Sequence, residues 1–472
     1  MRDLKAGGMD PMNENPQIPG SRKWKRYPSY KLSGVEWLGE VPEGWIVTRL
    51  KHEIKALIGG GTPESSNDEF WSNYEEGIPW VSIADMTGNK KIQSTEKKLT
   101  QMGLTSKRLK ILPKGTLIYS IYASLGKTSI LGIDAVTNQA ILGILLDNQK
   151  INRNYLWRWL EFMEKHIAYL SSSNTQENLN AEKVRNMVLL SPPPIQQHAI
   201  ATFLDRETAR IDALIEKKER LIALLEEKRA ALISHAVTKG LDPDAKMKES
   251  GVGWIGMVPD GWNQIKIKFL IKKIEQGWSP ECETRLAESE EWGVLKVGCV
   301  NGGIFNENEN KALPVSLEPY IEYEIKKGDI LMSRANTVEL LGSCAIVENV
   351  RERLLLCDKL YRITPTPTIL ESKFLVYFFA SHVSRFQMEQ EATGTSNSMK
   401  NIVQGTIREL IINLPPQNEQ KKIVNYIDNC CHTIDSGINK IECSINLLHE
   451  YRSALISSAV TGKIDVRQEA AV

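Results

Sequence analysis

The feature that most constrains this chain is an internal repeat. The segment SGVEWLGEVPEGW at residues 33–45 returns as SGVGWIGMVPDGW at residues 250–262, after 217 positions. The segment ALISHAVT at 231–238 returns as ALISSAVT at 454–461, after 223 positions. Self-similarity at a long, nearly constant spacing is the signature of a duplicated structural unit. We therefore expect two copies of one architecture, each with a Trp/Pro/Gly opening, a mixed domain and one long helix.

The middle of each copy diverges from the other, apart from short echoes. GGTP at residues 60–63 has the spacing of GWSP at 277–280, and KGTLIYS at 114–120 matches KGDILMS at 327–333. Apolar runs between Gly and Pro predict short strands in both copies. Constant ends around a variable middle are what a scaffold tuned to two different targets would show. Duplication followed by surface drift predicts the same pattern, and both explanations stay open at this point.

Two long segments at the ends of the copies carry a heptad pattern. Their seam positions are separated alternately by four and three residues, a mean period of about 3.5 that is typical of coiled coils. The apolar seam positions are Ile211, Ile215, Ile222, Leu225, Leu232, Ile434, Ile438, Ile441, Ile445, Leu448 and Leu455. Lys218, Arg229 and Ala236 complete the first series, and Arg452 and Ala459 complete the second. We expect the two helices to pair with each other, although a dimerisation rod is an open alternative.

The repeat, the strand signals and the helices together predict an α+β fold. We expect two tandem domains of mixed α/β type, joined by two long helices that pair as an antiparallel coiled coil with pseudo-two-fold symmetry. The length of the domain between the helices allows either orientation, and the antiparallel pair is favoured because it relates the two copies by an approximate two-fold axis. The predicted division is an N-terminal extension at 1–32, a first domain at 33–192, a central helix at 193–242, a second domain at 243–414, a distal helix at 415–465 and a C-terminal tail at 466–472. The basic cluster at 22–26 in the extension is interpreted as part of a solvated tail.

Composition excludes several classes of protein. No stretch approaches the roughly 18–20 unbroken apolar residues of a membrane span, and the N-terminus lacks the apolar core of a signal peptide. The seven cysteines all lie in the second half of the 472 residues without a C-x-x-C motif, which favours reduced thiols in the cytoplasm. The 59 Lys and Arg balance 58 Asp and Glu, giving a net charge of +1. Such a balance argues against holding nucleic acid by bulk electrostatics alone.

The sequence carries no convincing catalytic or metal motif. GKT at 126–128 resembles the end of a P-loop, but Ile121 stands where the earlier glycine is required. SPPP at 191–194 and LPPQ at 414–417 lack the aromatic residue with which adenine methyltransferases stack on the target base. CCH at 430–432 has the wrong spacing for metal ligands, because consecutive helical residues point in different directions. We therefore expect no catalysis, no metal and no cofactor in this chain itself.

The repeated motifs resemble those of the specificity (S) subunits of type I restriction-modification systems. They are the openings at 33–45 and 250–262, the Pro-Pro junctions, the ALISxAVT helix ends, and AVTKGLDP at 236–243 leading into the second opening. The resemblance spans nearly the whole chain, from about residue 33 to about 465, and leaves out the N-terminal extension. A membership in this family predicts that the two mixed domains are target recognition domains.

The resemblance also implies a function and a set of partners. Each domain would read one half of a bipartite, asymmetric site in double-stranded DNA, while the helices fix the unread spacer. Two modification (methyltransferase) subunits and the restriction (endonuclease and translocase) subunits would be the partners. S-adenosylmethionine, ATP and magnesium would then be held by those partners. A coiled-coil scaffold without DNA selectivity and a self-sufficient methyltransferase are the alternatives.

Base-reading residues are expected on loops of the variable middle, where polar side chains can reach base edges in the major groove. For the first domain these are Thr62, Ser120, Tyr122, Ser124, Lys127, Asn174, Gln176 and Asn178. For the second domain they are Ser279, Ser333, Arg334, Asn336, Thr395, Asn397 and Lys400. The alternative for each is a turn or cap residue, since Ser, Thr and Asn favour those positions.

Overall fold

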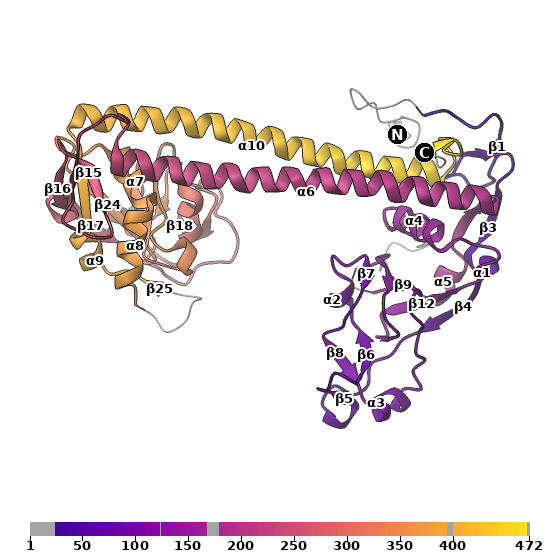
Figure 1. Cartoon of the computed structure of the whole chain (residues 1–472). Coiled ribbons are helices and arrows are strands. Elements are labelled where there is room, and N and C mark those ends of the chain that lie inside the picture. The colour runs from indigo at the N-terminus through magenta and orange to yellow at the C-terminus, as the bar shows by residue number, and fades with distance from the viewer. Residues whose placement is uncertain (1–23, 123, 168–178, 394–399, 470–472) are drawn as a thin grey trace, which may run out of the picture. The chain divides into compact units, whose positions relative to one another are not determined.

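The computed structural model describes residues 24–122, 124–167, 179–393 and 400–469. Two compact units are formed, unit 1 by Met1–Lys217 with Cys443–Val472 and unit 2 by Lys218–Glu442. Helix α6 (Pro194–Lys239) and helix α10 (Gln417–Val460) each contribute one end to each unit (Figure 1). The boundaries between the two units therefore lie inside the long helices. The division predicted from the sequence instead makes each long helix a segment of its own.

Unit 1 is built around a five-stranded sheet. Its strand order is β4 (Ile54–Gly59), β12 (Ile141–Leu146), β9 (Leu117–Ser120), β10 (Thr128–Leu131) and β7 (Lys91–Ile92). All neighbours pair antiparallel except β10 and β7, which pair parallel. Strand β9 is buried along its whole length, in keeping with its apolar sequence.

A second sheet and several short helices complete the mixed domain of unit 1. The second sheet has the order β11 (Val136–Thr137), β6 (Ile78–Val81), β8 (Lys97–Leu99) and β5 (Trp71–Ser72), and it packs around buried Trp80, Leu99 and Val136. The helices are α1 (Leu50–Glu53), η1 (Asp68–Phe70), α2 (Ile83–Met86), α3 (Gln101–Ser106), α4 (Arg153–Glu164) and α5 (Ala181–Arg185). Strand β1 (Tyr30–Leu32) pairs with β2 (Glu40–Pro42), and β3 (Ile46–Arg49) pairs with β13 (Val188–Ser191).

Unit 2 repeats this plan with a four-stranded main sheet. The order is β17 (Ile271–Gln276), β24 (Leu360–Pro365), β20 (Ile330–Ser333) and β22 (Cys344–Ile346), all antiparallel. The second sheet has the order β19 (Asn310–Ala312), β18 (Gly293–Leu295) and β23 (Leu354–Leu355). Each strand of the main sheet has a counterpart with the same neighbours in unit 1, so the sequence repeat corresponds to a repeat of topology.

The remaining elements of unit 2 also follow unit 1, with small additions. Strand β14 (Met247–Glu249) pairs with β15 (Met257–Pro259), β16 (Asn263–Lys266) with β26 (Ile411–Leu414), and β21 (Ala335–Asn336) with β25 (Lys400–Asn401). The helices are η3 (Ile267–Phe269), η4 (Val297–Gly303), η5 (Ile321–Tyr323), η6 (Val338–Leu340), α7 (Ser372–Ala380), α8 (His382–Glu391) and α9 (Gln404–Glu409).

The repeated opening serves to dock the first turn of a long helix in each unit. The buried indole of Trp45 donates a hydrogen bond from Nε1 to Gln196 in α6, at 2.8 Å. In unit 2 the buried Trp262 donates the equivalent bond to Glu419 in α10, at 3.1 Å. Since tryptophan buries a large apolar surface while its N–H needs a partner, this pairing fixes both position and angle of the helix start. The duplicated Trp/Pro/Gly motif is thus explained by packing.

The ends of the two long helices pack together within each unit. Within unit 1, Ile211 and Ile215 of α6 share a core with Leu455 and Ala459 of α10, so these helix ends lie side by side and antiparallel. All predicted seam residues are buried or half-buried, while the neighbouring Leu214, Leu221, Leu224 and Leu447 are exposed. Among the described residues no helix is long and apolar enough to cross a membrane. The mixed α+β class with two long helices is as predicted.

The expectation of a solvated N-terminal tail is wrong for Trp24 and Tyr27, whereas Lys25 and Arg26 are exposed as expected. The ring of Trp24 packs edge-on against Phe203 of α6 with centroids 5.0 Å apart, and Tyr27 is buried in the same core. The backbone N–H of Asp465 donates to the carbonyl of Lys25 at 2.7 Å. Sequence analysis missed this because the aromatic residues of the segment stand among basic ones, which suggested solvent. The segment forms part of unit 1 and contacts the other end of the chain.

Candidate nucleic-acid interface

Polar loops gather at one end of the main sheet of unit 1. Strand β4 ends at Gly59 beside Leu142 near the start of β12, and β9 ends at Ser120 beside Ile141. The loops that follow β4 and β9 and the loop that precedes β12 therefore share one edge. Of the residues predicted to read bases, Thr62, Ser120, Tyr122, Ser124 and Lys127 lie in these loops.

A close backbone contact holds the first of these loops in place. Gly60 lies against the loop before β12 so tightly that a Cβ atom would be 2.2 Å from the carbonyl oxygens of both Thr137 and Asn138. The next N–H, of Gly61, donates to the Thr137 carbonyl at 2.8 Å, and Trp80 donates from its indole to the Gly61 carbonyl at 2.9 Å. Only glycine fits at position 60, so the GGTP motif is required by this crossing of two loops.

The turn between β9 and β10 uses its serines internally. Ser120 is fully buried, and its hydroxyl accepts a hydrogen bond from the Lys127 N–H at 3.0 Å and donates to the Ser124 carbonyl. Gly126 adopts a φ of +78° and donates its N–H to the Ser120 carbonyl at 3.0 Å. Ser120 therefore belongs to the turn, the alternative that its residue type allowed. Tyr122 remains exposed, and Lys127 is half exposed beside Glu164, 2.5 Å from its carboxylate.

The same edge is built a second time in unit 2. Gly277, after β17, lies against the loop before β24, where a Cβ atom would be 2.0 Å from the Leu356 carbonyl oxygen. The Trp278 N–H donates to that carbonyl at 3.0 Å. Ser333 at the end of β20 is fully buried and donates to the Leu340 carbonyl at 2.9 Å, as a turn residue. Gly342 has a φ of +72°, matching the glycine of the unit 1 turn.

The predicted polar residues of unit 2 come together at this edge. The guanidinium of Arg334 donates to the Asp358 carbonyl at 3.2 Å and lies over the Tyr361 ring. Asn336 pairs in register with Lys400 across β21 and β25, and its amide donates to Asn301 at 3.3 Å. The side chains of Arg334, Asn336 and Lys400 are all half-exposed. They thus form a polar surface that continues the loop edge.

Five predicted residues lie outside the described residues, and others were missed. Those outside are Asn174, Gln176, Asn178, Thr395 and Asn397. Those missed include Gln139, which accepts a hydrogen bond from Thr62, and Asp358, which accepts one from Ser279. Each of these two residues comes directly after the backbone that the close glycine of its unit contacts. An alignment of the two copies around Gly60 and Gly277 would have pointed to both.

A basic loop adjoins the unit 1 edge and was also missed. Lys107, Arg108 and Lys110 are exposed, and Arg108 has a φ of +49°, which an L-residue adopts only at some cost. The side chain of Leu109 in this loop lies close to Gly61. A Cβ atom on Gly61 would be only 2.9 Å from it. Cations beside a polar edge suit the phosphate contacts that position a protein on DNA. The small net charge of +1 thus conceals a local basic cluster.

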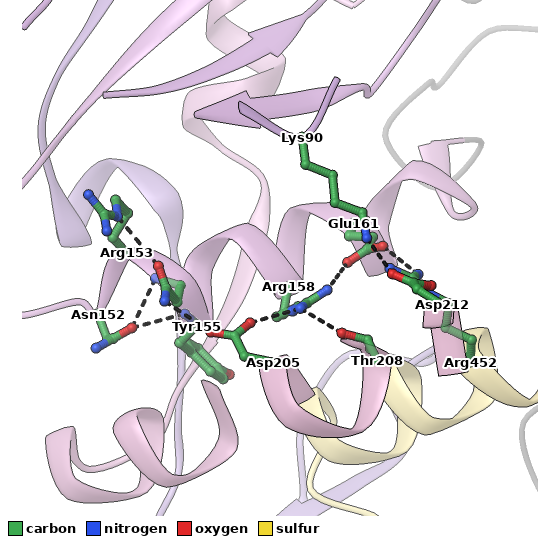
Figure 2. A network of polar contacts seen from close by, with 11 residues as sticks. Lys90, Asn152, Arg153, Tyr155, Arg158, Glu161, Asp205, Thr208, Asp212 and Arg452 are labelled. Carbon is green, nitrogen blue, oxygen red and sulfur yellow. Dashed lines mark hydrogen bonds and ion pairs between the residues drawn. The ribbon is translucent and has the colours of Figure 1, made fainter. Parts of the chain in front are cut away.

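A network of ion pairs joins the mixed domain of unit 1 to the long helices (Figure 2). Arg452 of α10 bonds Glu161 of α4 at 2.7 Å and Asp212 of α6 at 2.9 Å, while Arg158 bonds Glu161 at 2.9 Å. Lys90, just before β7, donates to Asp212 at 2.5 Å. Burial raises the pKa of the Glu161 carboxyl group, but the positive charges and hydrogen bonds of Arg452 and Arg158 lower it by more. The pKa of Glu161 therefore lies below its ordinary value of 4.5.

Unit 2 has a simpler version of this network. Arg229 of α6 pairs with Asp435 of α10, where Arg452 pairs with Asp212 in unit 1. Helix α7 takes the place of α4 in this unit. Its Lys373 lies 3.2 Å from the Asp428 carboxylate, and the Tyr377 hydroxyl donates a hydrogen bond to the same carboxylate. Charged residues at seam positions fix the register of a coiled coil, because any shift leaves them unpaired in a half-buried place. Both units use this device.

Comparison with known proteins also divides the chain into two similar parts. Residues 42–224 and 259–442 each match the family model for the type I restriction modification DNA specificity domain. The chain is 24% identical over 455 residues to the type I restriction enzyme EcoKI specificity subunit of Escherichia coli strain K12, covering 92% of both chains. It is 27% identical over 246 residues to the EcoEI specificity subunit of Escherichia coli, covering 52% of this chain but only 41% of that protein.

A solved structure shares the fold. It is described as showing complex assembly and conformational transition of the type I R-M system, and one of its chains superposes with a TM-score of 0.60. The identity is 17%, and the superposition covers 89% of this chain and 98% of the other. At this identity the likeness concerns the fold alone.

Proposed function

Because the chain belongs to the type I restriction modification DNA specificity family, we propose that it is the DNA-sequence adaptor of a methyltransferase and restriction complex. Each unit binds one half of a bipartite, asymmetric site in double-stranded DNA through the loop edge of its main sheet. The chain itself catalyses nothing. Two modification subunits and the restriction subunits supply S-adenosylmethionine, ATP and magnesium chemistry.

The observation that carries this proposal is one edge built twice with different exposed side chains. In both units a glycine crosses a loop without room for a Cβ, and a buried serine closes a turn. Around these constant parts the polar groups differ: exposed Tyr122, Lys127 and Gln139 in unit 1, against half-exposed Arg334, Asn336 and Asp358 in unit 2. A rigid frame that presents different polar groups suits the recognition of two different base sequences, since base edges specify while the frame positions.

The long helices are proposed to set the spacer between the half-sites. Helix α6 has 46 residues and α10 has 44, and each passes through both units without interruption. A helix rises by about 1.5 Å per residue, so its length defines a fixed separation in multiples of that step. The proposal treats the outer faces of these helices as the docking surface for the partner subunits. Exposed Leu214, Leu221, Leu224 and Leu447 support an apolar contact there.

The test is a map of methylated bases in cells. The full chain is expressed with the modification subunits of its own system, and the DNA is compared with that of cells lacking only this chain. The expected result is methylation at a single bipartite motif with a constant spacer, lost when the chain is absent. Methylation without sequence preference, or the same motif without the chain, would refute the proposal and favour a scaffold without DNA selectivity.

A further inference from the structure

One pair of residues occupies the same place in the two loop edges but differs in chemistry. In unit 1 the hydroxyl of Thr62 donates to the side-chain oxygen of Gln139. In unit 2 the hydroxyl of Ser279 donates to the carboxylate of Asp358, whose backbone N–H returns a bond to Ser279 at 3.1 Å. Each pair follows directly on the close glycine contact of its unit. A hydroxyl therefore orients a planar side chain at the edge of both units.

The groups that these side chains leave free are not the same. With one oxygen engaged by Thr62, Gln139 presents its amide nitrogen as a donor beside the remaining lone pair of the oxygen. Asp358 presents its second carboxylate oxygen, which accepts only. Within the part of the chain that the structure describes, neither free group has a hydrogen-bond partner; Gln139 is exposed and Asp358 half-exposed. Both are thus available to a ligand at the edge.

We propose that Gln139 and Asp358 determine the base preference of the two half-sites, Gln139 by selecting adenine and Asp358 by selecting cytosine. An amide that offers a donor and an acceptor side by side matches N7 and N6 of adenine in the major groove. A carboxylate that only accepts matches the N4 amino group of cytosine. The inference rests on the proposed function, which assigns one half-site to each edge but names no base and no base-reading residue.

The groups that the two edges share are less able to distinguish the half-sites. The serines of the turns are buried, the contacting glycines have no side chain, and the hydroxyls of Thr62 and Ser279 are used in orienting their partners. Groups that are alike in both units cannot read different bases. The carboxylate of Asp358 also needs cations nearby if it is to approach DNA. Arg334, which donates to the Asp358 carbonyl at 3.2 Å, and exposed Lys359 supply them.

The test replaces the amide of Gln139 by a carboxylate and the carboxylate of Asp358 by an amide, with little change in the shape of either side chain. Gln139→Glu and Asp358→Asn each keep an oxygen for the hydroxyl that orients the side chain, so the loops are expected to fold as before. Each full-length variant is expressed with its modification subunits, and the methylated motif is mapped. Gln149→Ala, an exposed glutamine just beyond the opposite end of β12, is the matched control. Thermal melting of the purified complexes establishes that the variants are folded.

The two variants are expected to change different halves of the motif. Gln139→Glu should lower methylation of sites with adenine at one position by roughly ten- to a hundredfold relative to cytosine, since a good bidentate contact discriminates on that order. Asp358→Asn should shift one position of the other half-site from cytosine toward adenine. The spacer and the remaining bases should stay as in the parent, and Gln149→Ala should leave the whole motif unchanged.

The outcomes separate this inference from the proposed function. If the parent chain directs no sequence-selective methylation, the proposed function fails and the inference fails with it. If the parent gives a bipartite motif and the folded variants give the same motif, only the assignment of Gln139 and Asp358 is refuted. A change in the same half-site for both variants, or a uniform loss of methylation at every base, also refutes it.

Discussion

Removal of Arg452 tests whether the ion network of unit 1 holds the helices in register. The side chain is only 14% exposed and bonds two carboxylates, Glu161 at 2.7 Å and Asp212 at 2.9 Å. Arg452→Met keeps much of the apolar stem but leaves both carboxylates without this partner. Breaking a buried pair costs about 3–5 kcal/mol. Because the carboxylates are 24% and 35% exposed, we expect the free energy of unfolding to fall by about 2–4 kcal/mol.

Unit 2 provides the matched control. Arg229 occupies the equivalent seam position, and Asp435 is its one ion-pair partner among the residues that the structure describes; the two side chains are 26% and 43% exposed. Arg229→Met should therefore cost about 1 kcal/mol. Calorimetry of the whole chain measures both variants, and a unit of this size loses about 2–4 °C of melting temperature per kcal/mol. Equal effects of Arg452→Met and Arg229→Met would refute the view that the second carboxylate makes the network of unit 1 stronger.

The pH dependence gives a second measurement on the same variants. The pKa values of Glu161 and Asp212 are lowered in the folded chain, from ordinary values of 4.5 and 3.8, because the arginines and Lys90 outweigh burial. A carboxyl group with a depressed folded pKa contributes stability above its unfolded pKa, and this is lost as pH falls through the folded pKa. The difference between parent and Arg452→Met should therefore be full at pH 7 and shrink below about pH 4. A difference that stays constant down to pH 3 would contradict the argument.

Three further predictions concern the edge and the seam. Gly60→Ala should abolish recognition of one half-site in a methylation map, because its Cβ would be 2.2 Å from two carbonyl oxygens, whereas Gly44→Ala, with no atom within 4 Å, should not. Ile441→Asp places a charge at a half-buried seam position and should lower the free energy of unfolding by about 2–4 kcal/mol; an unchanged melt would mean that the heptad register is wrong. Inserting four residues into α6 after Leu224 should change the spacer and leave both half-sites readable, and an unchanged spacer would contradict the role of the helix as a ruler.

The long-range organisation was predictable because it depends on periodic signals. Heptad spacing specifies which face of a helix is buried whatever it packs against, and the seam residues from Ile211 to Leu455 are buried or half-buried. The repeat predicted two equivalent units, and the sheets have equivalent strand orders. The sequence did not reveal that each unit contains one end of α6 and one end of α10. That division depends on which helix ends pack together, and the heptad pattern does not specify this. It also missed the docking of Trp24, whose partner Phe203 lies far along the chain.

The site was only partly predictable, because residue type does not determine which way a side chain points. Ser120 and Ser333 were chosen for their hydroxyls, yet both are buried and close turns. Gln139 and Asp358 carry no motif, and they become visible only when the glycine contacts align the two units. A turn serine and a base-reading serine have the same local sequence preferences. What separates them is burial, which depends on the loop that packs against them from elsewhere in the chain.

Chain connectivity makes the two units unequally sensitive to truncation. Unit 2 is the continuous stretch Lys218–Glu442, whereas unit 1 needs Cys443–Val472 to complete its core, with Leu455, Ala459 and Ile464 buried there. Removing residues 443–472 should therefore melt unit 1 and spare unit 2, since unit 2 loses no residue of its own core. Calorimetry should show one remaining transition, and limited proteolysis should leave a fragment that contains residues 243–414. Loss of both transitions would show that the units do not fold independently, and retention of both would show that the C-terminal segment does not complete the core of unit 1.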